Sequence, residues 1–192
     1  MSAPEIRTER LLLRGWRTAD LAPFAAIHAD PEVMEHLGGP RSRVESDALV
    51  ARLAEHFGRH GFGLWALEEV ESGDLAGFVG LSIPTFEAPF TPCVEVGWRL
   101  ARACWGRGYA IEGARAALRF GFERLGLDEI VSFTVPANTR SRRVMERLGM
   151  RRDPQRDFEH PRLPPGDPLR RHVLYRLARA EWKTGDDSRR RS

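Results

Sequence analysis

The sequence predicts a single-domain α/β protein with a mixed central sheet and helices on both faces. The chain has 192 residues, 42% of them hydrophobic, which is enough to bury one sizeable core. Its first half reads as strands joined by a hairpin turn. Its second half alternates strand, helix, strand and helix before a last strand, an order that predicts a right-handed crossover between parallel strands.

Hydrophobic spacing defines the elements of the first half. Residues 10–16, RLLLRGW, have the composition of a strand, and residues 18–29 repeat apolar side chains at helical spacing until Pro31 ends or restarts that element. Residues 44–60 carry an apolar helical stripe. The segments LWALEEV and LAGFVGLSI then read as two strands joined by the turn SGD.

The second half begins with the strand CVEVGWRL, residues 93–100. Its alternation predicts apolar side chains on one face and the others on the opposite face; these are Val94, Val96, Trp98 and Leu100 against Glu95, Gly97 and Arg99. A helix with a small-residue face follows, formed by Ala110, Ala114, Ala117, Leu118, Gly121 and Leu125.

The remaining elements have recognisable ends. The strand DEIVSFTV precedes the helix NTRSRRVMERLG, which Asn138 is expected to cap and Gly149 to end. Residues 152–169 hold five prolines and are not expected to form long regular structure, whereas RHVLYRL returns to strand alternation.

Composition excludes several classes of protein. No apolar run is long enough to span a bilayer, the N-terminus lacks a signal-peptide core, and the two cysteines show no metal or disulfide spacing, so we expect a cytoplasmic protein without a membrane partner. Net charge is only +3, so a nucleic-acid partner is not expected. His56 and His60 lack the glutamate and the third ligand of a zinc site, so no metal is expected.

The segment CWGRGYAIEG, residues 104–113, is the strongest candidate site. A loop between a strand and a helix N-terminus exposes backbone N–H groups that can bind a phosphate, and glycines at 106 and 108 allow the anion to approach. The alternative is that the two glycines only make a tight turn. The segment has neither the Gly-Lys-Ser/Thr of a P-loop nor the third glycine of a dinucleotide fingerprint.

This loop resembles the acetyl-coenzyme A loop of the GNAT N-acetyltransferases, Q/R-x-x-G-x-G/A, read here in residues 103–108 with alanine at the first position. The resemblance is strongest to the branch of the ribosomal-protein-alanine acetyltransferases, because TERLLLRGWRTADL and NTRSRRVMERLGM match that branch in order. It covers about residues 7–177. It implies one GNAT domain over residues 1–182. The C-terminal TGDDSRRRS has no apolar residue to anchor it, so residues 183–192 are expected to form a disordered basic tail.

The resemblance implies a mostly antiparallel sheet that splays at the acetyl-CoA site. Acetyl-CoA would be the co-substrate, and its acetyl group would pass to an amine by direct attack in a ternary complex. The pantetheine arm would pair with the backbone of Trp98, Arg99 and Leu100. The pyrophosphate would bind the N–H groups of Gly106, Arg107, Gly108, Tyr109 and Ala110. Asn138 would contact the pantetheine or the acceptor, or serve only as a helix cap.

Proton transfer requires a base and an acid. Glu95 is the first candidate base, because it is an acid in an otherwise apolar strand at the expected opening; a structural partner for an arginine is the alternative. Met145 stands where many family members carry a tyrosine thought to protonate the departing thiolate. Ser141 could instead donate a hydrogen bond to the thiolate, with Tyr175 as the weaker candidate; plain helix-surface and strand roles are the alternatives for these two residues.

The acceptor is expected to be a protein N-terminus or a small amine, bound by a monomer or homodimer. The proline-rich loop carries Asp157 and Glu159, acids that would suit an incoming ammonium group if the loop borders the acceptor site; a solvated surface loop is the alternative. A catalytically silent acyl-CoA sensor or partner-binding module is the other interpretation of the whole chain, because the usual tyrosine is missing.

Overall fold

The computed structural model describes residues 3–182, which form one α/β unit around a nine-stranded sheet. The strands are β1 (Ile6–Arg7), β2 (Leu11–Arg14), β3 (Leu64–Glu69), β4 (Leu75–Ser82), β5 (Glu95–Leu100), β6 (Glu129–Thr134), β7 (Arg151–Arg152), β8 (Phe158–Glu159) and β9 (Arg171–Ala178). The helices are α1 (Leu21–Ala29), α2 (Pro31–Met34), α3 (Arg43–His60), α4 (Tyr109–Arg119) and α5 (Thr139–Arg147). The predicted tail, residues 183–192, lies outside the described residues.

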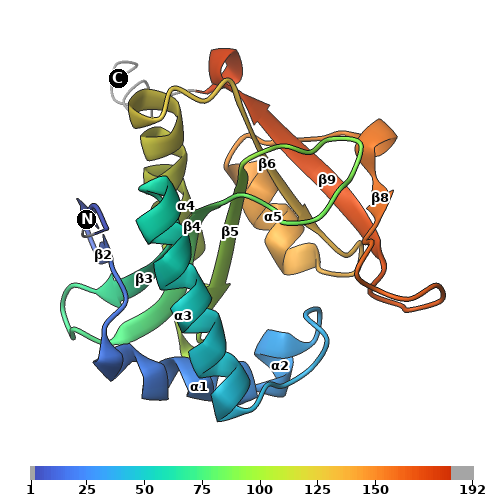
Figure 1. Cartoon of the computed structure of the whole chain (residues 1–192). Coiled ribbons are helices and arrows are strands. Elements are labelled where there is room, and N and C mark those ends of the chain that lie inside the picture. The colour runs from blue at the N-terminus through green and yellow to red at the C-terminus, as the bar shows by residue number, and fades with distance from the viewer. Residues whose placement is uncertain (1–2, 183–192) are drawn as a thin grey trace.

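The sheet is mixed and mostly antiparallel, as predicted. Its order is β1-β2-β3-β4-β5-β6-β9-β7, with β8 paired to β9. The described strands pair antiparallel except for β5 and β6, which are parallel and joined through α4. In Figure 1, β6 and β9 turn away from β5 toward the right of the view.

Helices cover both faces of the sheet. Successive residues of β4 point to opposite faces, so Phe78 and Val79 show which helix covers each one. Phe78 packs on Phe24 of α1, with ring centroids 5.9 Å apart. On the other face, a Cβ atom at Gly113 of α4 would lie 2.8 Å from Cγ1 of Val79, so only glycine lets α4 lie this close to β4. The helix α3 contacts α1, and in Figure 1 α3 runs down the middle of the view and crosses α1 at the bottom.

Capping geometry defines the ends of α3, and the predicted Asn138 cap of α5 is confirmed. Ser42 and Glu45 form a capping box at the start of α3, and Gly61 ends it with a φ of +73°. The Oδ1 atom of Asn138 accepts a hydrogen bond from the N–H group of Ser141 at 3.1 Å, so Asn138 caps α5.

The predicted small-residue face of α4 packs against the core, but it is only partly buried at its two ends. Ala110 and Leu125 are only partly buried, whereas Gly113 and Phe122 lie in the interior. A π-helical turn over Phe120–Arg124 adds a residue to the last turn of the helix and shifts its buried face.

The end of β2 also differs from the prediction. The strand β2 stops at Arg14 instead of reaching Trp16, whose indole N–H donates to the Leu64 carbonyl at 2.9 Å. Within residues 3–182, no helix is long and apolar enough to cross a membrane.

Candidate active site

A cavity of about 420 Å³ lies where the sheet opens between β5 and β6. The strand β5 pairs with β4 along its whole length, but it shares one registered pair with β6, Glu95 with Val131, in the part of the chain the structure describes. The Val131 N–H group donates to the Val94 carbonyl at 2.9 Å, and beyond this bond the two strands diverge. The edge of β5 that would otherwise bond to β6 therefore faces the cavity.

The ladder with β4 determines which backbone groups of β5 face the cavity. The N–H group of Ala101 donates to the Ala76 carbonyl at 2.9 Å, so the alternate residues Arg99 and Gly97 also direct their backbone groups toward β4. Trp98 then directs its N–H and carbonyl groups toward the opening. The backbone of Trp98, rather than that of Arg99, is available to pair with an extended ligand.

The loop before α4 presents a row of backbone donors at the mouth of the cavity. Gly106 and Gly108 have φ values of +75° and +83°, so the turn itself requires glycine at both positions. None of the N–H groups of residues 106–110 donates a hydrogen bond within residues 3–182. The two interpretations of the glycines are therefore compatible, because the turn that needs them also leaves the donors unpaired at a helix N-terminus.

Arg10, just before β2, and Glu69, at the end of β3, hold this loop in place. The Arg10 guanidinium donates to the Arg107 carbonyl at 2.9 Å and pairs with Glu112 at 2.6 Å. Arg107 pairs with Glu69 at 2.7 Å, and the Tyr109 hydroxyl donates to the same carboxylate, which lowers the pKa of Glu69. Arg107 is not among the residues that line the cavity, so its side chain acts on the outer side of the loop.

Glu95 lines the cavity at the point where β5 and β6 separate. Removal from water raises the pKa of its carboxyl group to about 8, and a hydrogen bond with Ser82 on β4 opposes that rise. Burial disfavours the charged form. A carboxyl group with this pKa can exchange a proton near neutral pH, as a base or acid catalyst must.

Ser141, Met145 and Tyr175 differ in their access to the cavity. Ser141 lines the cavity from the first turn of α5, and Met145 lines it from the next turn, with 1% of its surface exposed. Tyr175 is buried away from the cavity, where its hydroxyl donates to Glu146 at 3.0 Å and accepts from Arg142 at 3.2 Å. Of the two candidates for protonating the thiolate, only Ser141 reaches the cavity.

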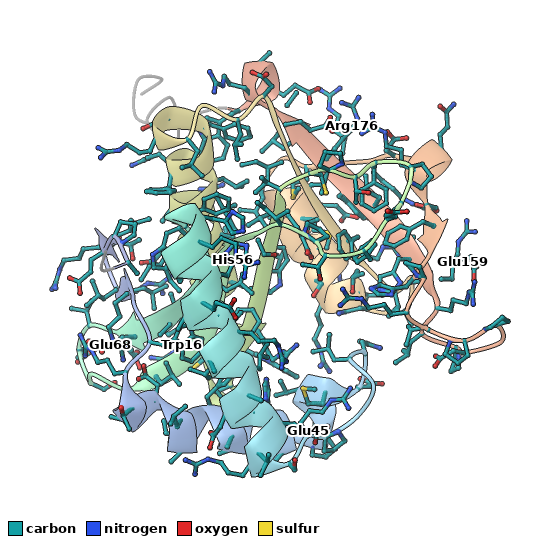
Figure 2. All side chains as sticks on the ribbon, in the orientation of Figure 1. Trp16, Glu45, His56, Glu68, Glu159 and Arg176 are labelled. Atoms are coloured by element: carbon teal, nitrogen blue, oxygen red, sulfur yellow. The ribbon has the colours of Figure 1, made fainter. Side chains whose placement is uncertain are left out.

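Asp157 and Glu159 do not line the cavity. The Asp157 side chain is 3% exposed and pairs with Arg152 at 2.6 Å, and its Oδ1 accepts from the Leu174 N–H group at 3.2 Å. Glu159 pairs with Arg170 at 2.7 Å, and Figure 2 shows it at the outer edge of the molecule. These contacts favour structural roles, because the loop folds back on β9 instead of over the cavity.

Two cavity residues, Ser132 and Arg140, could not be found from the sequence. Ser132 on β6 is 2% exposed and lines the cavity beside the opening. The Arg140 guanidinium lies 4.3 Å from the centre of the Trp105 ring, which links α5 to the glycine loop. No local sequence pattern marks these residues, since β6, α5 and the glycine loop come together only in the tertiary structure.

The other predicted residues of the cofactor site lie in the cavity wall. These are Trp98, Arg99, Leu100, Gly106, Gly108, Tyr109, Ala110 and Asn138. The Asn138 amide, besides capping α5, donates to the Thr134 hydroxyl at 3.1 Å. Among residues 3–182, no group of three or more His, Cys, Asp or Glu side chains is arranged to hold a metal ion.

A mixed sheet that splays beside a helix N-terminus with unpaired N–H groups defines an α/β fold suited to an extended phosphate-bearing ligand such as an acyl-coenzyme A. The chain belongs to the GNAT acetyltransferase family, since the family model described as "Acetyltransferase (GNAT) domain" matches residues 10–151. It is therefore an acetyl-CoA-dependent N-acetyltransferase, the enzymatic one of the two interpretations that the sequence leaves open.

Known proteins resemble the chain in both sequence and structure. The FsC-acetyl coenzyme A-N(2)-transacetylase of Aspergillus fumigatus is 34% identical over 163 residues, 81% of this chain and 68% of that protein. The uncharacterized protein YkkB of Bacillus subtilis is 31% identical over 144 residues, 74% of this chain and 83% of that protein. An acetyltransferase structure from Agrobacterium tumefaciens has a TM-score of 0.73 at 32% identity, over 92% of this chain and 95% of that one.

Proposed function

We propose that this enzyme transfers the acetyl group of acetyl-CoA to a primary amine by direct attack in a ternary complex. The observation that carries the proposal is the single Glu95–Val131 pair between β5 and β6. It leaves an opening with unpaired N–H groups from residues 106–110 at one end and the Glu95 carboxyl group at the other. One ligand can bind along the opening while a second reaches the same point from the other side.

The cofactor would follow the free edge of β5. Its pyrophosphate would accept hydrogen bonds from the N–H groups of residues 106–110, where the positive end of the α4 dipole adds to the attraction. Its pantetheine arm would pair with the backbone of Trp98 in the manner of an added strand. Leu100 would contribute its N–H group alone, since its carbonyl accepts from the Trp105 indole at 3.1 Å. Asn138 would face this arm from the start of α5.

The acceptor amine must lose a proton before its nitrogen can attack the acetyl carbonyl carbon. We assign this proton to Glu95, whose pKa of about 8 lies close to that of an amine, so that transfer between them is nearly balanced. The C–N bond then forms as the C–S bond breaks, and the electron pair goes to sulfur. One proton is released overall when an ammonium group becomes an amide and the thiolate becomes a thiol.

The departing thiolate would accept a hydrogen bond from Ser141. Its hydroxyl lies in the first turn of α5, where the helix dipole favours negative charge, and it lines the cavity. The neighbouring Met145 offers no exchangeable proton. We assign Ser141 the role of hydrogen-bond donor to sulfur.

The acceptor class rests on the sequence resemblance to the ribosomal-protein-alanine acetyltransferases. That branch suggests a protein N-terminus, and a small amine is the second possibility. The Aspergillus relative is named for transfer from acetyl-CoA to an N(2) position, which supports amine transfer in general.

A CoA-release assay over peptides and small amines, with mass spectrometry of the products, tests the proposal. Acetyl-CoA binding should be measured by calorimetry in parallel. An N-acetylated product formed by wild type and lost in Glu95→Gln supports the assigned mechanism. Tight acetyl-CoA binding with no product from any amine would contradict it.

A further inference from the structure

Arg99 lies on the acceptor side of β5, opposite the helix that would bind the cofactor phosphates. It pairs in the ladder with Phe78 of β4, and its guanidinium carbon lies 5.3 Å from the Phe78 ring centre. Phe78 packs on Phe24 of α1, whereas α4 packs on the opposite face at Val79. The Arg99 side chain therefore enters the cavity from the α1 side of the sheet.

The hydrogen-bonding capacity of Arg99 is largely unused. One terminal nitrogen, Nη1, contacts Nε2 of His28, while Nε is buried without a hydrogen-bond partner in residues 3–182. No carboxylate of those residues lies within 4.0 Å of its guanidinium. The buried Arg14 is the contrast, because it pairs with Asp20 at 2.7 Å and with Glu68 at 2.6 Å.

The surrounding groups do not neutralise Arg99. Removal from water lowers its pKa to about 10, and the like charge of Arg41 acts in the same direction, so it is still a cation at neutral pH. Removal from water and the nearby Arg99 also lower the pKa of His28 to about 4, so His28 is neutral. The cavity-lining Glu32 is bound by Arg102 instead. Arg99 is partly buried, with its Nε atom fully removed from solvent. A partly buried cation without an anion is costly, and a ligand anion would reduce that cost.

Gly97 leaves space between this cation and the candidate base. Glu95, Gly97 and Arg99 share one face of β5, and all three line the cavity. A Cβ atom on Gly97 would have Glu95 Oε1, at 3.9 Å, as its nearest neighbour, so this stretch of the face is open. The Cα atoms of Glu95 and Arg99 are four residues apart, roughly 13 Å along the strand, before their side chains lean inward.

We propose that the acceptor is an amine that also carries a carboxylate, and that Arg99 binds this carboxylate through the edge formed by Nε and Nη2 while Glu95 receives the amine proton. Both nitrogens of this edge point the same way and match the two oxygens of a carboxylate. His28 holds the opposite side of the guanidinium and fixes its plane. The assignment rests on the amine-transfer function proposed above and narrows its substrate class.

The test compares amino acids with their uncharged counterparts. A series of α- and ω-amino acids of increasing length is assayed beside the corresponding amino amides, with wild type, Arg99→Gln, Arg99→Lys and the control Arg52→Gln from the exposed face of α3. For the best substrate pair, the kcat/KM of wild type should be about 10- to 100-fold higher for the amino acid than for its amide. This is the range expected for a charge-assisted hydrogen bond. Arg99→Gln should lose this preference, Arg99→Lys should keep part of it, and Arg52→Gln should keep all of it.

Three results separate this inference from the proposed function. Acetylation of amino amides as fast as of amino acids by wild type would overturn the carboxylate site and leave amine transfer standing. The same conclusion follows if the preference survives in Arg99→Gln. If no amine is acetylated, the proposed amine transfer is wrong, and thermal shifts of the CoA-loaded protein then test the carboxylate site. Amino acids must raise the Tm of wild type more than the amides do, and Arg99→Gln must abolish this difference. Unchanged CoA affinity shows that each variant is folded.

Discussion

Glu95 on β5 and Val131 on β6 form the single registered pair that joins these two strands within residues 3–182. The pair lies at the vertex of the opening, so the base candidate sits at the deepest point of the splay. The unpaired N–H groups lie at the start of α4, which packs on one face of the sheet. The Arg99 side chain lies on the opposite face, toward α1. The proposed reaction takes place where these two approaches meet.

Gly108→Asp should weaken acetyl-CoA binding at least about tenfold, or about 1.4 kcal/mol, in calorimetry. The substitution adds a negative charge beside the expected pyrophosphate and a side chain at a φ of +83°. Gly73→Asp is the matched control, because Gly73 has a φ of +75° in the exposed β3–β4 turn. Equal affinities in the two variants would rule out the loop as the phosphate site.

Glu95→Gln should lower acetyl transfer by about 10²- to 10⁴-fold at neutral pH while acetyl-CoA affinity stays near wild type. For wild type, kcat/KM should rise with pH through the pKa of about 8, as the carboxyl group loses its proton. The variant should lack this rise. A variant that retains both the rise and the rate would place the base elsewhere.

The contribution of Glu95 to the stability of the free protein should fall as pH rises from about 4.5 to 8. In this window the folded protein holds the Glu95 proton, whereas the unfolded chain, with its carboxyl at the ordinary pKa of 4.5, has released it. Each pH unit in this window lowers the free energy of unfolding by at most about 1.4 kcal/mol. Denaturant unfolding at pH 5, 6.5 and 8 should show Glu95→Gln gaining stability relative to wild type as pH rises. A constant difference between the two proteins would mean that this carboxyl has an ordinary pKa.

Asp157→Ala should destabilise the fold by about 1–3 kcal/mol, because it leaves the Leu174 N–H group and the Arg152 guanidinium without their buried acceptor. Glu159→Ala should change stability by less than about 0.5 kcal/mol, since Glu159 is exposed. Neither variant should raise KM for the amine. A higher KM for the amine at unchanged stability would indicate that these acids do bind the acceptor.

Local patterns in the sequence determined most of the elements and marked the glycine loop before α4 as a candidate site. Alternation in residues 93–100 identified β5, and Asn138 and Gly149 marked the ends of α5, because strand period and helix caps depend on neighbours in the chain. The ordered motifs around Gly106 and Gly108 indicated the family, which the family model confirmed. These features are local, so the sequence alone was sufficient for them.

Only the tertiary structure decided which side chains share the cavity. Ser141 reaches it and Tyr175 does not, because Tyr175 is held by Glu146 and Arg142 on the far side of α5. The loop with Asp157 folds onto β9, which no composition of prolines and acids could reveal. The unpaired state of Arg99 depends on residues from α1, β4 and the loop before α3, far apart in the sequence. Charge balance in a buried site is set by all the elements that surround it, and a sequence read along one segment does not contain that information.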